Sequence, residues 1–329
     1  MSRQDKPTVS VVIPTYNRPH YLKHCLRCLH IQASEAFPFE VVVVTDGPDA
    51  ASADVAAMYA NISYMPLRYL SLPEKKGPAA ARNLGWRSAC GELIIFTDDD
   101  CLCAGGFVAA YVKAYEEQQL QLAAFTGKLV VPLPGQPTDY EQNTAQLATA
   151  EFVTANCACT RATLHAVNGF DEEFTMAWRE DSELQFKIID RHIPVLRTET
   201  AVVIHPVRKA QWGVSIKEQK KSMFNALLKK KHPLLFREKI YRGPLINYYA
   251  MIIALLAGLV FLLVNLPLAA LISMGIWFFL TLQFAYKRLQ RTTRSATHVV
   301  EMLVTSALIP VLSVYWTLYG SWRFKSLLL

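Results

Sequence analysis

The pattern of apolar and polar positions divides the chain into two parts that meet near residue 207. In the first part, short apolar runs alternate with amphipathic stretches, which predicts strands and helices in turn. Because each predicted strand is followed by a helix, the expected fold class is α/β with a doubly wound, mostly parallel sheet. The predicted strands cover residues 8–14, 40–46, 67–70 and 92–96, and the predicted helices cover 21–29, 52–59 and 78–88.

After residue 100 the alternation becomes less regular. A proline-rich turn at 132–137 separates the first half of the domain, 1–131, from a second half, 132–207, that mixes strands and helices. Such an α+β lobe is typical of the second substrate's side of a two-substrate cleft. The further predicted strands are 125–131, 152–160 and 195–205, and the further helices are 105–117, 161–167 and 180–191.

The second part of the chain, 243–329, is apolar enough to enter a membrane. Residues 245–264 and 266–286 carry no charge, and each stretch would cross the roughly 30 Å hydrocarbon core as a helix. A third stretch, 302–322, contains Pro310, and the sequence leaves open whether it spans, re-enters or lies in the interface. The segment before the spans, 208–242, is basic. Its predicted helix at 212–231 suits either the membrane surface or ordinary packing.

Charge changes sign at the same boundary. Residues 1–207 carry 17 Lys and Arg against 24 Asp and Glu, a net charge of −7, whereas residues 208–329 carry 17 against 3, a net charge of +14. Basic residues flank the first two spans, and the turn at Asn265 between them carries none. By the positive-inside rule we predict a multi-pass protein of the cytoplasmic (inner) membrane with its first domain in the cytoplasm. We expect the basic residues to meet membrane lipids and not nucleic acid.

Two further features agree with a cytoplasmic domain. Residues 1–7 are polar and lack the apolar core of a secretory signal. The seven cysteines include no complete pattern of zinc ligands, so we expect reduced, buried thiols.

Three consecutive carboxylates, Asp98, Asp99 and Asp100, follow the predicted strand at 92–96. The carboxyl ends of parallel strands face the ligand crevice of an open α/β sheet. Carboxylate oxygens there suit a hard divalent ion such as Mg2+ or Mn2+ that shares the phosphates of a substrate. The alternative is a solvated acidic turn before the next helix, since Asp is common in turns and at helix starts.

Other polar residues fall at strand ends on the same side of the predicted sheet. They are Pro14 to Arg18 after the first strand and Asp46 after the second, and Arg82 with Asn83 on the third helix. Together with the acidic triplet, this set resembles the glycosyltransferase family 2 enzymes of the GT-A fold, over residues 8–207. That family transfers a sugar from a nucleotide diphosphate donor. The resemblance makes 1–131 the nucleotide-binding half and 132–207 the acceptor half of a GT-A glycosyltransferase domain.

The resemblance implies a role for each of these residues. Asp100 would hold the metal ion, Asp98 would take part in the metal site and contact the ribose, and Asp99 would occupy a variable middle position. Asp46 would contact the base, and Arg82 would serve phosphate or base or, as the alternative, form a salt bridge on the helix surface. The residues implied in binding the nucleotide sugar are Pro14, Thr15, Tyr16, Asn17, Arg18, Asp46, Arg82, Asp98 and Asp99.

The acceptor half carries the remaining candidates. Glu180 and Asp181 match the family's acidic pair, with Asp181 as the catalytic base and Glu180 orienting it or binding the acceptor. Both acids would also suit the start of a helix for electrostatic reasons alone. Trp178 could stack on a sugar or a lipid headgroup, or lie in the core. The resemblance implies His205 as a third metal ligand, although a lone His is often structural.

The sequence therefore predicts a metal-dependent, inverting glycosyltransferase using Mn2+ or Mg2+ and a UDP-, GDP- or dTDP-linked donor. No QxxRW motif is present, which favours transfer of a single sugar over polymer synthesis. A lipid-linked or other envelope glycan acceptor is expected because of the membrane spans. The alternatives are a polyprenyl-phosphate glycosyl synthase and a noncatalytic scaffold that binds nucleotide sugar.

Overall fold

The computed structural model describes residues 9–34, 37–62 and 64–328 and contains two compact units. Within the described residues, the first unit is formed by 9–132 and 145–207, and the second by 133–144 and 208–328. The second unit therefore begins near the boundary read from the sequence, but it also takes in residues 133–144. Residues 1–7, which are predicted to lack a secretory signal, and Thr8, the predicted start of the first strand, lie outside the described residues.

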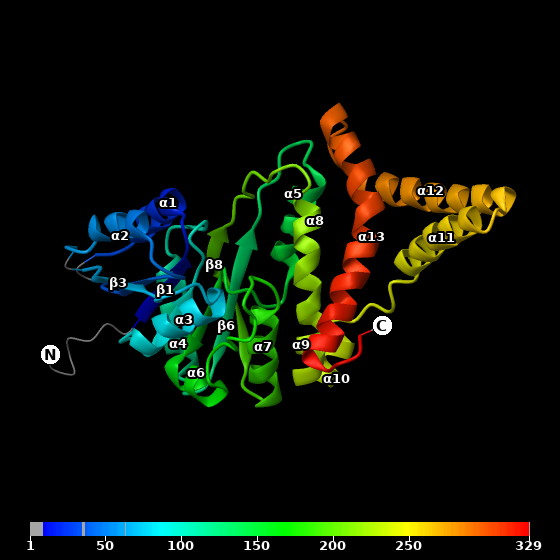
Figure 1. The fold of residues 1–329 in the computed structure, drawn as a ribbon. Coiled ribbons are helices and arrows are strands. Elements are labelled where there is room, and N and C mark those ends of the chain that lie inside the picture. Colours follow the sequence, from blue (N-terminus) through cyan, green and yellow to red (C-terminus); the bar gives the residue numbers. More distant parts are fainter. Residues whose placement is uncertain (1–8, 35–36, 63, 329) are drawn as a thin grey trace. The chain divides into compact units, whose positions relative to one another are not determined.

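The first unit contains eight strands in one sheet, and its helices alternate with them along the chain (Figure 1). The strands are β1 (Val9–Thr15), β2 (Glu40–Thr45), β3 (Leu67–Ser71), β4 (Leu93–Phe96), β5 (Leu102–Cys103), β6 (Ala124–Val130), β7 (Cys157–Thr160) and β8 (Val195–Ile204). The helices are α1 (Pro19–His30), α2 (Ala50–Ala57), α3 (Pro78–Ser88), α4 (Phe107–Gln118), η1 (Gln146–Thr149), α6 (Arg161–Val167) and α7 (Glu180–Asp190).

The strand order is β3-β2-β1-β4-β7-β6-β8-β5, a mixed and mostly parallel sheet. Strands β1 to β4 are parallel to one another, β7 runs antiparallel to both of its neighbours, and β8 is again parallel to β6. The expected α/β class is confirmed. The predicted strand at 152–160 is too long, because residues before Cys157 form a turn in which Asn156 N–H donates to the Val153 carbonyl at 3.1 Å.

Alternate residues of the central strands build two separate cores, one on each face of the sheet. Val11 and Val43 pack with α1 and α4 on one face, and Val12 and Val44 pack with α3 and α7 on the other. A strand covered on both faces must be apolar along its whole length, which explains the four consecutive valines of β2. The carboxyl ends of β1, β2 and β4 are thereby fixed beside one another.

The second unit is mainly helical. The predicted helix at 212–231 is broken in the middle by a 3-10 segment, η2 (Gln219–Met223), whose residue Met223 packs against α13 (Ala296–Phe324). A Cβ on Gly320 of α13 would lie 2.5 Å from the Met223 carbonyl oxygen, so the two backbones are in direct contact. The elements of the second unit are α5 (Asp139–Ala145), α8 (Val214–Glu218), η2 (Gln219–Met223), α9 (Phe224–Lys231), α10 (Pro233–Leu235), η3 (Phe236–Ile240), α11 (Ile246–Leu263), α12 (Pro267–Leu289) and α13 (Ala296–Phe324).

Three helices of this unit are long and apolar enough to cross a membrane: α11, α12 and α13. The turn between α11 and α12 places Asn265 in the left-handed region at φ 56°, which joins them as the expected hairpin. The third apolar stretch is continuous helix from Ala296 to Phe324 in spite of Pro310. Many large apolar side chains of these helices are exposed, including Leu263 at 83% and Phe279 at 65%, as expected of surfaces that lipid would cover.

Candidate active site

The three aspartates after β4 have different partners, although they are adjacent in sequence. Asp99 is the most enclosed of them at 1% exposure. Its carboxylate accepts a hydrogen bond from Thr15 Oγ1 at 2.6 Å and one from Arg18 Nη1 at 3.1 Å. Burial raises the pKa of Asp99 to about 6, although the charge of Arg18 and the hydrogen bond from Thr15 oppose that rise. The family resemblance assigns Asp99 to a variable position, whereas in the structure Asp99 links the end of β1 to the end of β4.

Asp98 points instead toward helix α3. Arg82 Nη2 donates to Asp98 Oδ1 at 2.7 Å, and Arg82 is only 3% exposed. Burial alone would raise the pKa of Asp98, but the charge and the hydrogen bond of Arg82 outweigh it and hold this pKa below its usual value. The alternative reading of Arg82 as a surface salt bridge is wrong, because the guanidinium lies in the interior.

Asp100 lies close to a histidine from the carboxyl-terminal end of the first unit. His205 follows β8, and its Nε2 atom lies 3.5 Å from Asp100 Oδ1. Among the described residues, His205 Nδ1 is buried without a hydrogen-bond partner. The donor atoms of Asp100, Cys101 and His205 lie within 4.8 Å of one another. Hard divalent ions favour carboxylate and imidazole over a thiol, so Asp100 and His205 are the suitable donors and Cys101 is not.

The segment after β1 forms the edge of the site next to these acids. Asn17 has a left-handed backbone at φ 52°, and its N–H donates to Asp49 Oδ2 at 2.8 Å. Asp49 also caps α2 by accepting from Ser52 N–H. The helix predicted at 52–59 starts after this N-cap, although an Asp before three small residues is a typical N-cap pattern. Pro14 and Thr15 end the strand as buried residues.

Asp46 holds a loop in place. Its carboxylate accepts from the backbone N–H groups of Lys76, at 2.7 Å, and Gly77, at 2.9 and 3.0 Å. The same loop places Lys75 Nζ 4.2 Å from the centre of the Tyr16 ring. The predicted contact of Asp46 with a base would therefore have to be made beside this loop, since both carboxylate oxygens already accept backbone hydrogen bonds.

The candidate base lies at the start of α7. Arg179 precedes the helix with a left-handed backbone at φ 75°, which is a strained conformation for a non-glycine residue. Glu180 is buried and its Oε1 atom lies 3.3 Å from Arg82 Nη1. Burial and the neighbouring charge of Asp181 raise the pKa of Glu180 to about 7, against the attraction of Arg82. Arg82 thus bridges Asp98 of the first half to Glu180 of the second.

Asp181 differs from Glu180 in being partly exposed. Burial raises the pKa of Asp181, and the hydrogen bond that its Oδ1 atom accepts from Ser182 N–H, at 2.6 Å, lowers it again in part. Trp178 is 40% exposed, and the Arg179 guanidinium lies 4.7 Å from its ring centre. Trp178 is therefore a surface residue of this loop and not a core tryptophan.

Two contacts that the sequence did not predict join the halves. Asn83 donates through Nδ2 to the Phe170 carbonyl at 2.9 Å, and its Oδ1 atom accepts from Phe170 N–H at 2.9 Å. Gly77 has φ 103°, and a Cβ there would lie 2.5 Å from the Thr175 carbonyl oxygen. Both pairs are far apart in sequence, so no local pattern could have shown them.

Residues 10–135 match the family model described as "Glycosyl transferase family 2". The chain is 34% identical to Glycosyltransferase AglE of Haloferax volcanii over 95 residues, which are 29% of this chain and 31% of that protein. It is 27% identical to Validoxylamine A glucosyltransferase of Streptomyces hygroscopicus subsp. jinggangensis over 245 residues, which are 63% of this chain and 55% of that protein. The chain thus spans about a third to about half of these relatives.

Solved structures show the same fold. Mannosyltransferase PcManGT from Pyrobaculum calidifontis, in complex with GDP-Man and Mn2+, has a TM-score of 0.58 and 18% identity over 97% of this chain and 88% of its own. GalNAc-T7, with UDP, GalNAc and Mn2+, has a TM-score of 0.51 and 15% identity over 72% of this chain and 57% of its own. These likenesses identify the first unit as a fold of GT-A type.

Proposed function

We propose that this chain is a family 2 glycosyltransferase, as the match of residues 10–135 to that family model indicates, and that it transfers a single sugar from a nucleotide diphosphate donor, with inversion, to a lipid-linked or other envelope glycan acceptor. The observation that supports this proposal most is that Arg82 forms ion pairs with both Asp98 and Glu180. A single buried guanidinium contacts one acid of the triplet and one acid of the acceptor half. Such a link sets the two halves of a transfer site at a fixed spacing, which is what attack on a bound donor requires.

The donor would bind at the carboxyl ends of β1, β2 and β4. Asp100 and His205 would hold Mn2+ or Mg2+, and the ion would neutralise charge that develops on the leaving diphosphate. The partly exposed Asp98 would face the ribose, held by Arg82. We propose a UDP-, GDP- or dTDP-linked sugar, and the ring of Tyr16 with Lys75 beside it offers a surface for the nucleotide.

The acceptor would be activated by Asp181. Inverting transfer needs a carboxylate that takes a proton from the attacking hydroxyl. Asp181 is suited to this because it is partly exposed at the helix start, whereas Glu180 beside it is buried against Arg82 and serves to position the helix. The exposed ring of Trp178 could stack on an acceptor sugar.

The helices α11, α12 and α13 support attachment to the cytoplasmic membrane, with the first unit in the cytoplasm as the charge pattern predicts. An anchored enzyme suits an acceptor that is itself held in the bilayer. A reporter fused at the amino terminus would contradict this topology if it were found outside the cytoplasm.

The test of the base is Asp181→Asn, with Asp54→Asn, an exposed acid on α2, as its matched control. A panel of nucleotide sugars and lipid extracts first identifies the donor by its consumption. With a hydroxyl acceptor, Asp181→Asn should lower kcat by about two to four orders of magnitude and leave nucleotide affinity unchanged. Substantial residual turnover would favour a polyprenyl phosphate acceptor, which needs no strong base. Nucleotide binding without any donor consumption would favour a scaffold.

The test of the metal site is a calorimetric titration of UDP and GDP with and without Mn2+. We expect Mn2+ to strengthen binding to the wild-type chain and to have little effect on Asp100→Ala or His205→Ala. Equal affinity of Asp100→Ala and wild type in the presence of Mn2+ would remove Asp100 from the metal site.

A further inference from the structure

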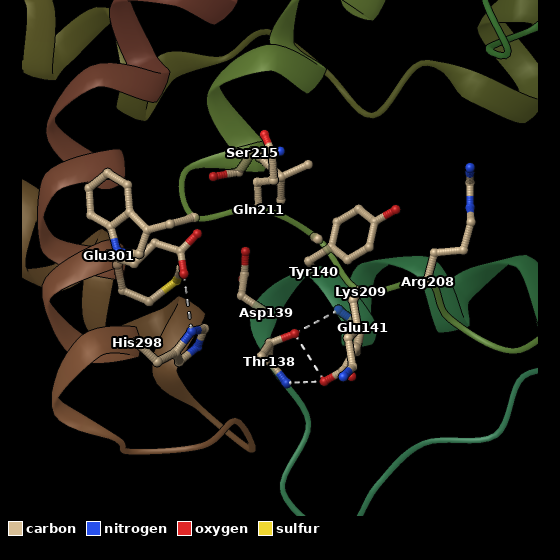
Figure 2. A pocket seen from close by; sticks show the side chains of 14 residues that line it. Thr138, Asp139, Tyr140, Glu141, Arg208, Lys209, Gln211, Ser215, His298 and Glu301 are labelled. Atoms are coloured by element: carbon tan, nitrogen blue, oxygen red, sulfur yellow. Dashed lines mark hydrogen bonds and ion pairs between the residues drawn. The ribbon is translucent and has the colours of Figure 1, made fainter. Parts of the chain in front are cut away.

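A polar cavity lies within the second unit, apart from the residues of the candidate active site. Its volume is about 240 Å3, and three segments line it: the start of α5, the chain from Arg208 to Ser215, and the first two turns of α13. Figure 2 shows the side chains around it. Both acidic and basic residues line the cavity. The charge of a ligand that could bind there depends on which of these side chains already have partners within the protein.

The acids of this cavity are engaged by the protein. Asp139 Oδ2 accepts from Arg288 Nη2 at 2.8 Å, in an ion pair that is largely buried. Glu141 Oε2 accepts from the N–H and the hydroxyl of Thr138. Glu301 Oε1 accepts from Gly213 N–H at 2.7 Å. Their negative charges are therefore partly balanced within the fold.

Two basic groups of the cavity, Lys209 and His298, have fewer partners within the protein. Among the described residues, Lys209 has no hydrogen-bond or ion-pair partner, and its side chain is exposed. His298 is 4% exposed, and neither of its ring nitrogens has a hydrogen-bond partner within the part of the chain that the structure describes. Its Nδ1 atom lies 3.6 Å from Glu301 Oε2, which leaves Nε2 for a ligand. A buried imidazole nitrogen without a hydrogen-bond partner is costly unless something binds it.

The cavity also has a position that suits a membrane headgroup. His298 is the third residue of α13, so the cavity lies at the first turn of a helix that could cross the bilayer. The unpaired N–H groups of a first turn attract anions. Trp212 lines the cavity and is 55% exposed, and tryptophan is enriched at the level of the headgroups.

We propose that this cavity binds the phosphate group of an anionic phospholipid headgroup, with Lys209 and His298 as its donors. The inference goes beyond sugar transfer, because it uses only the second unit and the position of α13. A chain that fails to transfer sugar could still bind the lipid, and a chain that fails to bind the lipid could still bind nucleotide.

The experiment titrates the full chain in nonionic detergent with dihexanoyl phosphatidylglycerol and follows its thermal unfolding. Dihexanoyl phosphatidylcholine, glycerol phosphate and inorganic phosphate serve as the comparison ligands. The variants are Lys209→Gln and His298→Gln, and the matched control is Lys217→Gln, an exposed lysine of α8 that does not line the cavity. Because Lys209 is exposed, its substitution should leave the fold intact even if that of the buried His298 does not.

We expect saturable stabilisation by phosphatidylglycerol and little by phosphatidylcholine. Lys209→Gln should weaken the anionic lipid about five-fold, the change expected for one basic residue near an anionic surface, while Lys217→Gln should not. Equal weakening in Lys209→Gln and Lys217→Gln, or no saturation, would overturn the site. If glycerol phosphate or inorganic phosphate bound as tightly as the lipid, the cavity would be a phosphate site and the lipid assignment would be wrong.

Discussion

Replacing Arg82 tests whether one guanidinium holds the two halves of the site together. The change is Arg82→Met, which keeps much of the side-chain volume and removes the charge. It leaves Glu180 and Asp98 without the cation that lies 3.3 Å and 2.7 Å from them. Breaking a buried ion pair by removing one partner costs about 3–5 kcal/mol.

Two features of the structure place the expected cost near the lower end of that range. The Asp98 side chain is 27% exposed, so water screens part of its charge. The pKa of Glu180 is already raised to about 7, and without Arg82 this carboxyl would take up a proton more readily and lose its charge. We therefore expect a loss of about 3 kcal/mol at pH 8 and a smaller loss at pH 6.

The assay is thermal unfolding of the full chain in detergent at both pH values. For a domain of this size, a loss of about 3 kcal/mol lowers Tm by roughly 6–12 °C. Arg82→Lys, the matched control, keeps the charge and should lose less. The double variant Arg82→Met/Glu180→Gln should recover part of the loss because the buried charge is gone. A change in Tm of less than about 2 °C, or the same loss at both pH values, would refute this account of Arg82.

Three further outcomes are expected. Glu180→Gln should remove a pH dependence: because the pKa of Glu180 is higher in the folded chain than in the unfolded one, wild type should lose stability relative to the variant as the pH rises from about 4.5 through about 7, and parallel pH profiles of Tm would contradict this. Asp99→Asn should lower stability by about 1–3 kcal/mol through its lost contacts with Thr15 and Arg18, so an unchanged denaturant midpoint would show that Asp99 is replaceable after all. Gly77→Ala should cost more than about 1 kcal/mol because of its φ of 103° and its approach to Thr175, whereas Gly105→Ala, with open space around it, should stay within about 0.5 kcal/mol in the same measurement.

The features that the sequence could predict are those that a short stretch of chain determines. The valine run of β2 and the apolar run of β4 are buried on both faces and could hardly be anything but central strands. The uncharged stretches at 245–264 and 266–286 predict the long apolar helices α11 and α12 just as directly. The GT-A fold, inferred from motifs at strand ends, is confirmed by the solved structures, and residues 10–135 match the glycosyltransferase family 2 model.

The features that the sequence could not predict depend on contacts between distant residues. Nothing near Asp99 in the chain indicates that Thr15 and Arg18 will surround it. Residues before β7 are apolar enough for a strand, but the polar side chain of Asn156 bonds to the carbonyls of Lys128 and Ala201 and the backbone turns there instead. The roles assigned to Asp181, Asp100 and His205 in catalysis and metal binding remain predictions.

The contact between His205 and Asp100 can form only late in the synthesis of the chain. The strands β1, β2 and β4 leave the ribosome early, whereas His205 follows β8, the last strand of the sheet. Domains tend to fold as units from the amino-terminal side as they are made. Until β8 has paired with β6, Asp100 has no imidazole beside it. With the metal site as proposed, Mn2+ uptake during refolding would report when β8 pairs with β6. A nascent chain that stops before β8 would contain the whole acidic triplet and yet lack the Asp100–His205 pair.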